Sequence, residues 1–318
     1  MIEISAPSRI HMALIDMNGR SGRIDGGAGL ALDACGVRLR ARKADEIIIN
    51  GYPELETALS GVAARLLPDG CGIEIDVLEK MPMHIGLGIG TQSFLSVAAA
   101  VSKLYGPDRS VRELSAISGR GGTSGIGTIA FEKGGFIVDG GHRTSEKKAF
   151  APSSKSRAPP APLLVRYDFP EEWDVLLAIP SGRGLSGEEE AAFFKSVCPI
   201  PIDEVRTVSH IILMQMMPAL LEKDIEAFGR AVDGLQETGF NKRERAVQPE
   251  ESGRVSAVMK KGGSFGVGLS SFGPVLYGFS ESRRHSEEIR DAVLSEMAPG
   301  GRFIITKAKN TGAVCHRV

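Results

Sequence analysis

The stretch Met81-Pro-Met-His-Ile-Gly-Leu-Gly-Ile-Gly-Thr-Gln-Ser93 leads directly into an apolar run that has the length of a helix, Phe94–Tyr105. Three glycines at alternate positions let the backbone approach an anion closely: Gly86, Gly88 and Gly90. The first N–H groups of a helix have no partners inside it, so a helix that begins near Thr91 would complete a phosphate-binding loop. A plain strand-to-helix turn has the same spacing. The stretch is not a Walker A loop, because no Gly-Lys-Ser/Thr follows, and it is a poor dinucleotide-binding fingerprint.

Two further glycine clusters lie at residues 119–127 and 262–273. The first combines the cation of Arg120 with the hydroxyls of Thr123 and Ser124 on open glycine backbone. Three polar glycine loops in one chain indicate one large anionic ligand that is contacted from several directions.

The rest of the chain mixes strands and helices without strict alternation, which is typical of the α+β class. Alternating and helical apolar spacings predict strands through residues 1–50 and at 71–78, 128–131, 136–139, 163–167, 173–179, 275–279 and 302–306, and helices at 53–67, 94–105, 111–118, 187–196, 203–221, 223–235 and 286–297. A length of 318 residues predicts about two domains. Residues 144–162, rich in Ser, Lys and Pro, are the best boundary, so we expect domains at 1–160 and 161–318. The same segment could instead be a lid over the site or disordered.

The composition excludes several classes of protein. Lys and Arg number 38 against 39 Asp and Glu, so the charge gives no footprint for nucleic-acid binding. The N-terminus lacks signal-peptide features, and the apolar runs Phe94–Val101 and Ile211–Leu221 are too short to cross a membrane. The four cysteines are widely dispersed, which predicts reduced thiols in a cytoplasmic protein.

Three motifs in order resemble those of the GHMP kinase superfamily. They are Pro7-Ser-Arg-Ile-His-Met-Ala-Leu14, Pro82-Met-His-Ile-Gly-Leu-Gly88 and Gly266-Val-Gly-Leu-Ser-Ser-Phe-Gly-Pro274. The resemblance implies a two-domain α+β fold, with an N-terminal domain like domain 2 of ribosomal protein S5 and a ferredoxin-like C-terminal domain. It also implies a site in the cleft between the domains.

Two departures from the kinase pattern bear on the chemistry. Ile89-Gly90 stands where the kinases usually have Ser-Ser, so the hydroxyl that helps hold Mg·ATP is missing. Gly127 stands where many have the Asp that deprotonates an alcohol.

These departures match one branch of the superfamily. Arg120–Gly127, Gly134–His142 and Leu163–Pro170 with Trp173 resemble the β-ribofuranosylaminobenzene 5′-phosphate synthase family of archaeal methanopterin biosynthesis. The resemblance implies that phosphoribosyl pyrophosphate is joined to 4-aminobenzoate or 4-hydroxybenzoate, with loss of CO₂ and diphosphate, and that the chain is a homodimer. An ATP-dependent small-molecule kinase and a non-catalytic phosphometabolite-binding protein are the alternatives.

That reaction accounts for the missing carboxylate. The nucleophile is a ring carbon, so no hydroxyl proton has to be removed before attack. The donor is highly anionic, which calls for cationic side chains and Mg²⁺ at the leaving diphosphate.

We expect Asp16, Arg23 and His11 at the reacting centre, with Asp16 or Asp139 as the metal ligand. Binding of phosphate or substrate is expected from the following residues: Ser8, Arg9, Gly86, Gly88, Gly90, Thr91, Gln92, Arg120, Gly121, Thr123, Ser124, Asp139, His142, Arg183, Gly268, Ser270 and Ser271. Simpler alternatives remain for several of them: a helix cap for Thr91, turn chemistry for Asp139 and His142, and a surface turn for Arg183. Glu188-Glu-Glu190 is expected to form the exposed, acidic first turn of a helix.

Overall fold

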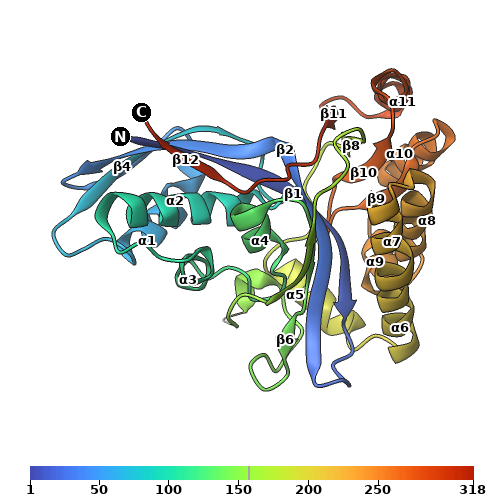
Figure 1. Cartoon of the computed structure of the whole chain (residues 1–318), viewed down its shortest axis with the longest axis horizontal. Coiled ribbons are helices and arrows are strands. Elements are labelled where there is room, and N and C mark those ends of the chain that lie inside the picture. Colours follow the sequence, from blue (N-terminus) through green and yellow to red (C-terminus); the bar gives the residue numbers. More distant parts are fainter. Residues whose placement is uncertain (157) are drawn as a thin grey trace.

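The computed structural model describes residues 1–156 and 158–318, which form two β-sheets covered by helices (Figure 1). The large sheet has the order β12-β1-β2-β4-β3, and β5, β6 and β7 extend it through β2 and β5. Its strands are β1 (Ile2–Asp16), β2 (Arg23–Ala44), β3 (Ile47–Asn50), β4 (Gly72–Lys80), β5 (Phe136–Asp139), β6 (His142–Arg143), β7 (Leu163–Tyr167) and β12 (Val314–Arg317). The small sheet is antiparallel with the order β11-β8-β10-β9. Its strands are β8 (Asp174–Ile179), β9 (Phe265–Leu269), β10 (Leu276–Ser280) and β11 (Arg302–Thr306).

The helices of the first half pack against the large sheet. They are α1 (Glu56–Ala64), preceded by a 3₁₀ turn at Pro53–Leu55, α2 (Ile89–Tyr105), α3 (Val111–Ile117) and α4 (Ile126–Lys133). Figure 1 shows α1 and α2 below the sheet, and α2 contacts both β1 and β2. Because β1 and β2 are its central strands, they are buried over most of their length and hold the first motif rigidly.

The helices of the second half lie beside the lower part of β1 and β2 and on the small sheet (Figure 1). They are α5 (Glu188–Val197), α6 (Ile202–His210), a π-helical segment (Ile211–Met216), α7 (Met217–Glu222), α8 (Ile225–Gln236), α9 (Gly239–Ala246), α10 (Glu250–Lys261) and α11 (Arg283–Glu296). An aromatic cluster connects the two sheets. Phe228 of α8 lies 6.3 Å from Phe136 of β5 and 5.2 Å from Phe279 of β10, between ring centroids.

The predicted α+β architecture is confirmed, but several predicted elements differ. The strand predicted at residues 128–131 is wrong, because this segment belongs to α4. The apolar run Thr128–Phe131 is too short to tell a buried strand from a buried helix. The sequence prediction also missed α9 and α10. Strands β7 and β12 lie beyond residue 160 in the sequence, yet both pair within the large sheet. The division between the two sheets therefore does not follow the domain boundary that we expected at residue 160.

Residues 144–156 pack against the first half of the molecule through a buried ion-pair network. The Lys147 ammonium lies 3.0 Å from the Asp25 carboxylate and 2.9 Å from the Thr123 hydroxyl. The His142 ring contacts the same carboxylate at 2.6 Å. Among the described residues, no helix is long and apolar enough to cross a membrane.

Candidate active site

A cleft of about 370 Å³ lies where the three motifs meet. Its lining includes His11, which was expected at the reacting centre, and nine of the 17 residues that were expected to bind phosphate or substrate: Arg9, Gly86, Gly88, Gly90, Thr91, Arg120, Thr123, Ser124 and Ser271. They come from β1, the β4–α2 loop, the α3–α4 loop and the loop after β9, so the fold brings together segments up to 260 residues apart in the sequence.

Ser270 links the three motifs. Its hydroxyl accepts the backbone N–H of His11 at 2.9 Å and donates to the carbonyl of Gly86 at 2.7 Å. Gly86 can come this close because it has φ +96°, and a Cβ there would lie 2.4 Å from the Ser270 carbonyl oxygen. Ser270 therefore sets the position of the glycine loop rather than facing the ligand itself.

Two arginines bring positive charge to the cleft. The Arg9 guanidinium donates to the Gly86 carbonyl at 2.6 Å, and burial lowers its pKa to about 10. Arg120 stacks on the Phe94 ring with its guanidinium carbon 4.1 Å from the centroid, and burial lowers its pKa to about 10 as well. Both side chains remain charged at neutral pH. Within the described part of the chain, the Arg120 guanidinium has no counter-ion and its buried Nε has no acceptor.

His11, Ser124 and Asp139 form a hydrogen-bonded chain at the side of the cleft. The His11 Nε2 lies 3.0 Å from the Ser124 hydroxyl, which in turn lies 3.4 Å from an Asp139 carboxylate oxygen. Burial and the nearby Arg9 lower the pKa of His11 to about 3, so the ring is neutral. Burial raises the pKa of Asp139 to about 6, while the N–H groups of Gly141 and Gly125 oppose that rise.

The cleft lining also holds two carboxyl groups that the sequence prediction missed, Glu190 of α5 and Glu244 of α9. Burial raises the pKa of Glu190 to about 7, opposed by Arg9, and burial together with Glu190 raises that of Glu244 to about 8. The prediction of an exposed acidic turn holds for Glu188 and Glu189 and is wrong for Glu190. Glu190 lies four residues before the buried Phe194, so the two side chains share one face of the helix. This spacing could have indicated that Glu190 is not exposed.

Apolar side chains form part of the wall of the cleft. Leu14, Leu185, Phe194 and Phe272 all line the cleft. Phe194 and Phe272 are almost fully buried, with ring centroids 6.1 Å apart, so the wall is well packed. A flat aromatic ring could pack against a wall of this kind.

Asp16 and Arg23, which we expected at the reacting centre, are not among the residues that line the cleft. Asp16 closes the β1–β2 turn, where its carboxylate accepts the N–H groups of Asn18 and Gly19 at 3.0 and 2.9 Å. Arg23 donates to the carbonyls of Gly140 and Gly141 at 2.6 and 3.0 Å. Their hydrogen bonds thus stabilise two turns, and spacing in the sequence could not reveal this.

Eight other predicted residues also lie outside the cleft lining: Ser8, Gln92, Gly121, Asp139, His142, Arg183, Gly268 and Ser270. The Ser8 hydroxyl donates to Ala34, and the Gln92 amide donates to Gly127. His142 belongs to the buried Asp25 network. Arg183 is exposed and pairs with Glu189, as the surface-turn alternative anticipates.

The comparisons with known proteins agree with this geometry. The family models of the GHMP kinases match residues 55–135 (N-terminal domain) and residues 216–299 (C-terminal). Beta-ribofuranosylphenol 5′-phosphate synthase of Archaeoglobus fulgidus is 43% identical, with 98% of each chain covered. The protein of the same name from Methanothermobacter thermautotrophicus is also 43% identical, over 98% of this chain and 97% of its own.

The chain belongs to the beta-ribofuranosylphenol 5′-phosphate synthase family. This confirms the predicted family resemblance and the prediction that the protein is an enzyme. The relatives' name refers to a phenol product, whereas the family name in the prediction refers to an aminobenzene product. A crystal structure of homoserine kinase from Cytophaga hutchinsonii superimposes with a TM-score of 0.72 at 17% identity, covering 99% of this chain and 97% of that one. That likeness shows the GHMP fold.

Side chains at the two departures from the kinase pattern would be crowded in this synthase. A Cβ on Gly127 would lie 3.1 Å from the Thr91 methyl carbon, so Thr91 would have to shift by a few tenths of an ångström. A Cβ on Gly90 would lie 2.9 Å from the Met83 methyl carbon and 3.4 Å from the Arg120 guanidinium. Both glycines therefore serve the packing of the cleft, including the placement of Arg120.

Proposed function

We propose that this synthase joins phosphoribosyl pyrophosphate to 4-hydroxybenzoate or 4-aminobenzoate, giving a C-riboside 5′-phosphate, CO₂ and diphosphate, as a step of methanopterin biosynthesis. The observation that supports this most strongly is the mixed lining of the cleft. Arg9, Arg120 and the glycine loop offer an environment for an anionic donor, apolar side chains of the same lining suit an aromatic ring, and Glu190 and Glu244 add two carboxyl groups.

The bond changes need little proton transfer. The ring carbon that bears the carboxylate attacks the anomeric carbon of the ribose, and the bond from that carbon to the diphosphate oxygen breaks. The carbon–carboxylate bond then breaks, and its electron pair returns to the ring as CO₂ leaves. The charged guanidiniums of Arg9 and Arg120 would stabilise the departing diphosphate. A site without a carboxylate at position 127 is compatible with this chemistry.

Mg²⁺ is our proposed cofactor. Asp139, one of the two expected ligands, fits poorly, because its oxygens accept the N–H groups of Gly125 and Gly141. Asp16 is engaged in its turn in a similar way. Glu190 fits better, since it lines the cleft and accepts no side-chain hydrogen bond within the described residues. Mg²⁺ commonly uses one or two protein carboxylates together with substrate phosphates and water, and when bound it would neutralise diphosphate charge.

We propose that Glu244 interacts with the para substituent of the acceptor. Its carboxyl group lines the cleft, and its side chain is 5% exposed. A para hydroxyl that donates a hydrogen bond to the carbonyl oxygen of this carboxyl group would push electron density toward the attacking ring carbon. The relatives are named for a ribofuranosylphenol product, which favours 4-hydroxybenzoate over 4-aminobenzoate for this chain.

The test is an assay with phosphoribosyl pyrophosphate, Mg²⁺ and carboxyl-labelled 4-hydroxybenzoate or 4-aminobenzoate, in separate reactions. Release of labelled CO₂ with stoichiometric diphosphate supports the proposal. Formation of ADP from ATP and a small alcohol, without CO₂ release, would show a kinase instead. Tight binding of the donor with neither product would show a binding protein.

Replacement of Gly127 by Asp should not create ATP-dependent phosphorylation, and robust phosphorylation by that variant would count against the carbon-nucleophile explanation.

A further inference from the structure

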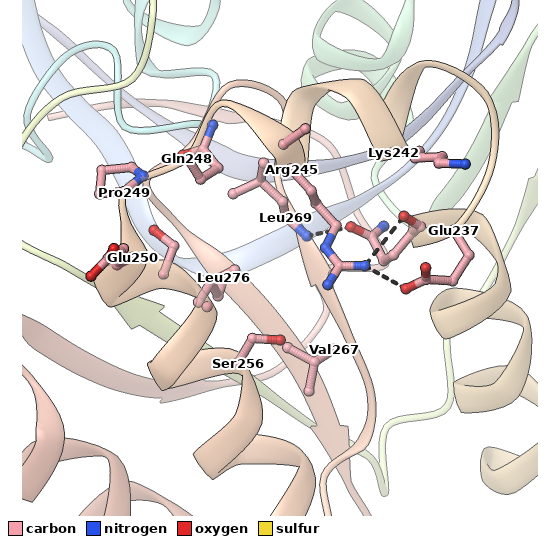
Figure 2. A pocket seen from close by; sticks show the side chains of 15 residues that line it. Glu237, Lys242, Arg245, Gln248, Pro249, Glu250, Ser256, Val267, Leu269 and Leu276 are labelled. Atoms are coloured by element: carbon pink, nitrogen blue, oxygen red, sulfur yellow. Dashed lines mark hydrogen bonds and ion pairs between the residues drawn. The ribbon is translucent and has the colours of Figure 1, made fainter.

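A second cavity, also about 370 Å³, lies between α8, α9, α10 and the edge strand β9 (Figure 2). It is distinct from the cleft, and α9 contributes to both: Glu244 lines the cleft, whereas Lys242 and Arg245 line the second cavity. None of its lining residues has a part in the proposed chemistry. The cavity therefore requires an explanation of its own.

Two buried donors on the lining of this cavity have no partner. Gln236 is 1% exposed; its Oε1 accepts the N–H of Leu269 at 3.1 Å, but its Nε2 has no acceptor in the described structure. Ser252 is 4% exposed, and its hydroxyl is likewise without a partner there. Buried polar groups in native proteins are rarely left unpaired. An acceptor-bearing ligand in the cavity would satisfy both groups.

The charged side chains of the lining are two cations, Lys242 and Arg245, and two carboxylates, Glu237 and Glu250. Arg245 uses one nitrogen for the Glu237 carboxylate at 2.6 Å, as Figure 2 shows, and for the Gln236 carbonyl at 3.3 Å, and its other nitrogens have no hydrogen-bond partner among the described residues. Glu250 faces Arg254 at 3.9 Å, so its charge is partly compensated. Lys242 is exposed at the rim and has no ion pair with any described residue.

The remaining surface of the cavity is apolar. Val267, Leu269 and Leu276 belong to adjacent strands of the small sheet and line the cavity together. A ligand that fits both parts has an anionic head group with several acceptor oxygens and an apolar body.

We propose that this cavity is a second binding site, for a small organic acid whose carboxylate or phosphate head group accepts hydrogen bonds from Gln236 and Ser252. The apolar body of the acid lies on the small sheet. This proposal does not depend on the reaction that the cleft catalyses.

The test uses the ¹⁵N-labelled full-length protein, with benzoate and phenyl phosphate as separate probes and backbone amide shifts as the readout. Because both probes can also enter the cleft, each titration is repeated in an Arg120→Met variant. We expect saturable shifts at Gly253 and Gly268 that persist in that variant, and the probe that binds more tightly identifies the head group. Shifts confined to Gly86 and Gly88, or shifts that do not saturate, would overturn the proposal.

Variants within the cavity make the test specific. Ser252→Ala removes one buried donor and should weaken the probe at least about tenfold, because a hydrogen bond to a charged group is lost. Ser295→Ala is the control, because Ser295 is exposed on α11 and does not line the cavity, and this variant should stay within about threefold of wild type. Equal effects of the two substitutions would contradict the assignment. Since the Ser252 hydroxyl is unpaired without ligand, Ser252→Ala should fold with an unchanged or raised thermal midpoint.

Discussion

Arg120 shows how a single residue can define a binding site. Its guanidinium is held against Phe94 by stacking, and a Cβ on Gly90 would crowd it at 3.4 Å, yet it faces no carboxylate among the described residues. A buried cation without a counter-ion is costly, so natural proteins usually pair it. The anionic donor that we propose would be its partner in the cleft.

Replacing Arg120 with Met should lower kcat/KM by about 10- to 100-fold, because hydrogen bonds to a charged group are worth about 1.5–3 kcal/mol. Arg120→Lys should recover only part of the loss, since an ammonium lacks the planar fork of donors. Steady-state kinetics with the donor varied would measure both effects. Arg284, exposed on α11 and paired with Glu288, offers the control substitution to Met. Equal kinetics for the two Met variants would exclude Arg120 from donor binding.

His11 should make the protein less stable as the pH falls. Its folded-state pKa of about 3 lies below the ordinary value of 6.5, so between these values only the unfolded chain binds the proton. From pH 6.5 to about pH 4.5 this should cost about 2 kcal/mol of unfolding free energy. His11→Gln, which does not titrate, should lose less over that range in urea denaturation, whereas His316→Gln, exposed on β12, should behave like wild type. Identical pH dependence for His11→Gln and wild type would refute the assignment.

At the scale of elements, residues 144–156 act as a strap across the first half of the molecule. Pro152 and Ser153 line the cleft, and Lys147 anchors the strap to Asp25 and Thr123. Thr123 precedes Ser124, so the strap also supports the loop that faces the ligand. Residues 144–156 are therefore a packed segment over the site.

Lys147→Met should destabilise the protein by about 3–5 kcal/mol, because it leaves the buried Asp25 carboxylate without its lysine. The double variant Lys147→Met/Asp25→Asn removes the charge as well, and Asn tolerates the positive φ of +67° at position 25. We therefore expect it to be more stable than the single variant. Guanidinium denaturation measures both. A double variant that is less stable than Lys147→Met would show that the network is not held together by charge.

At the scale of the whole molecule, the two sheets are coupled. Strands β7 and β12 come from beyond residue 160 and pair in the large sheet, while Phe228 packs on aromatic rings from both sheets. This coupling predicts one cooperative unfolding transition. Trp173, the only tryptophan of the chain, packs 5.7 Å from Phe228 and reports on the junction.

Phe228→Ala should lower the unfolding free energy by about 3–5 kcal/mol, because the ring is fully buried and its loss leaves a cavity. Phe228→Leu retains more volume and should cost less. In wild type, Trp173 fluorescence and far-ultraviolet circular dichroism should give coincident transitions. Two separated transitions would show that the sheets unfold independently.

The sequence by itself determined the α+β class, the family and the glycine-rich motifs that meet at the cleft. Those features rest on local signals: glycines before a helix, strand alternation, and motifs contiguous in the chain. The Thr128–Phe131 strand was wrong because four residues, three of them apolar, carry no period. Only the tertiary structure revealed that Asp16 and Arg23 serve turns and that Glu190 and Glu244 face the cleft. The position of such side chains depends on packing between elements far apart in the chain, and a spacing along one segment does not encode that.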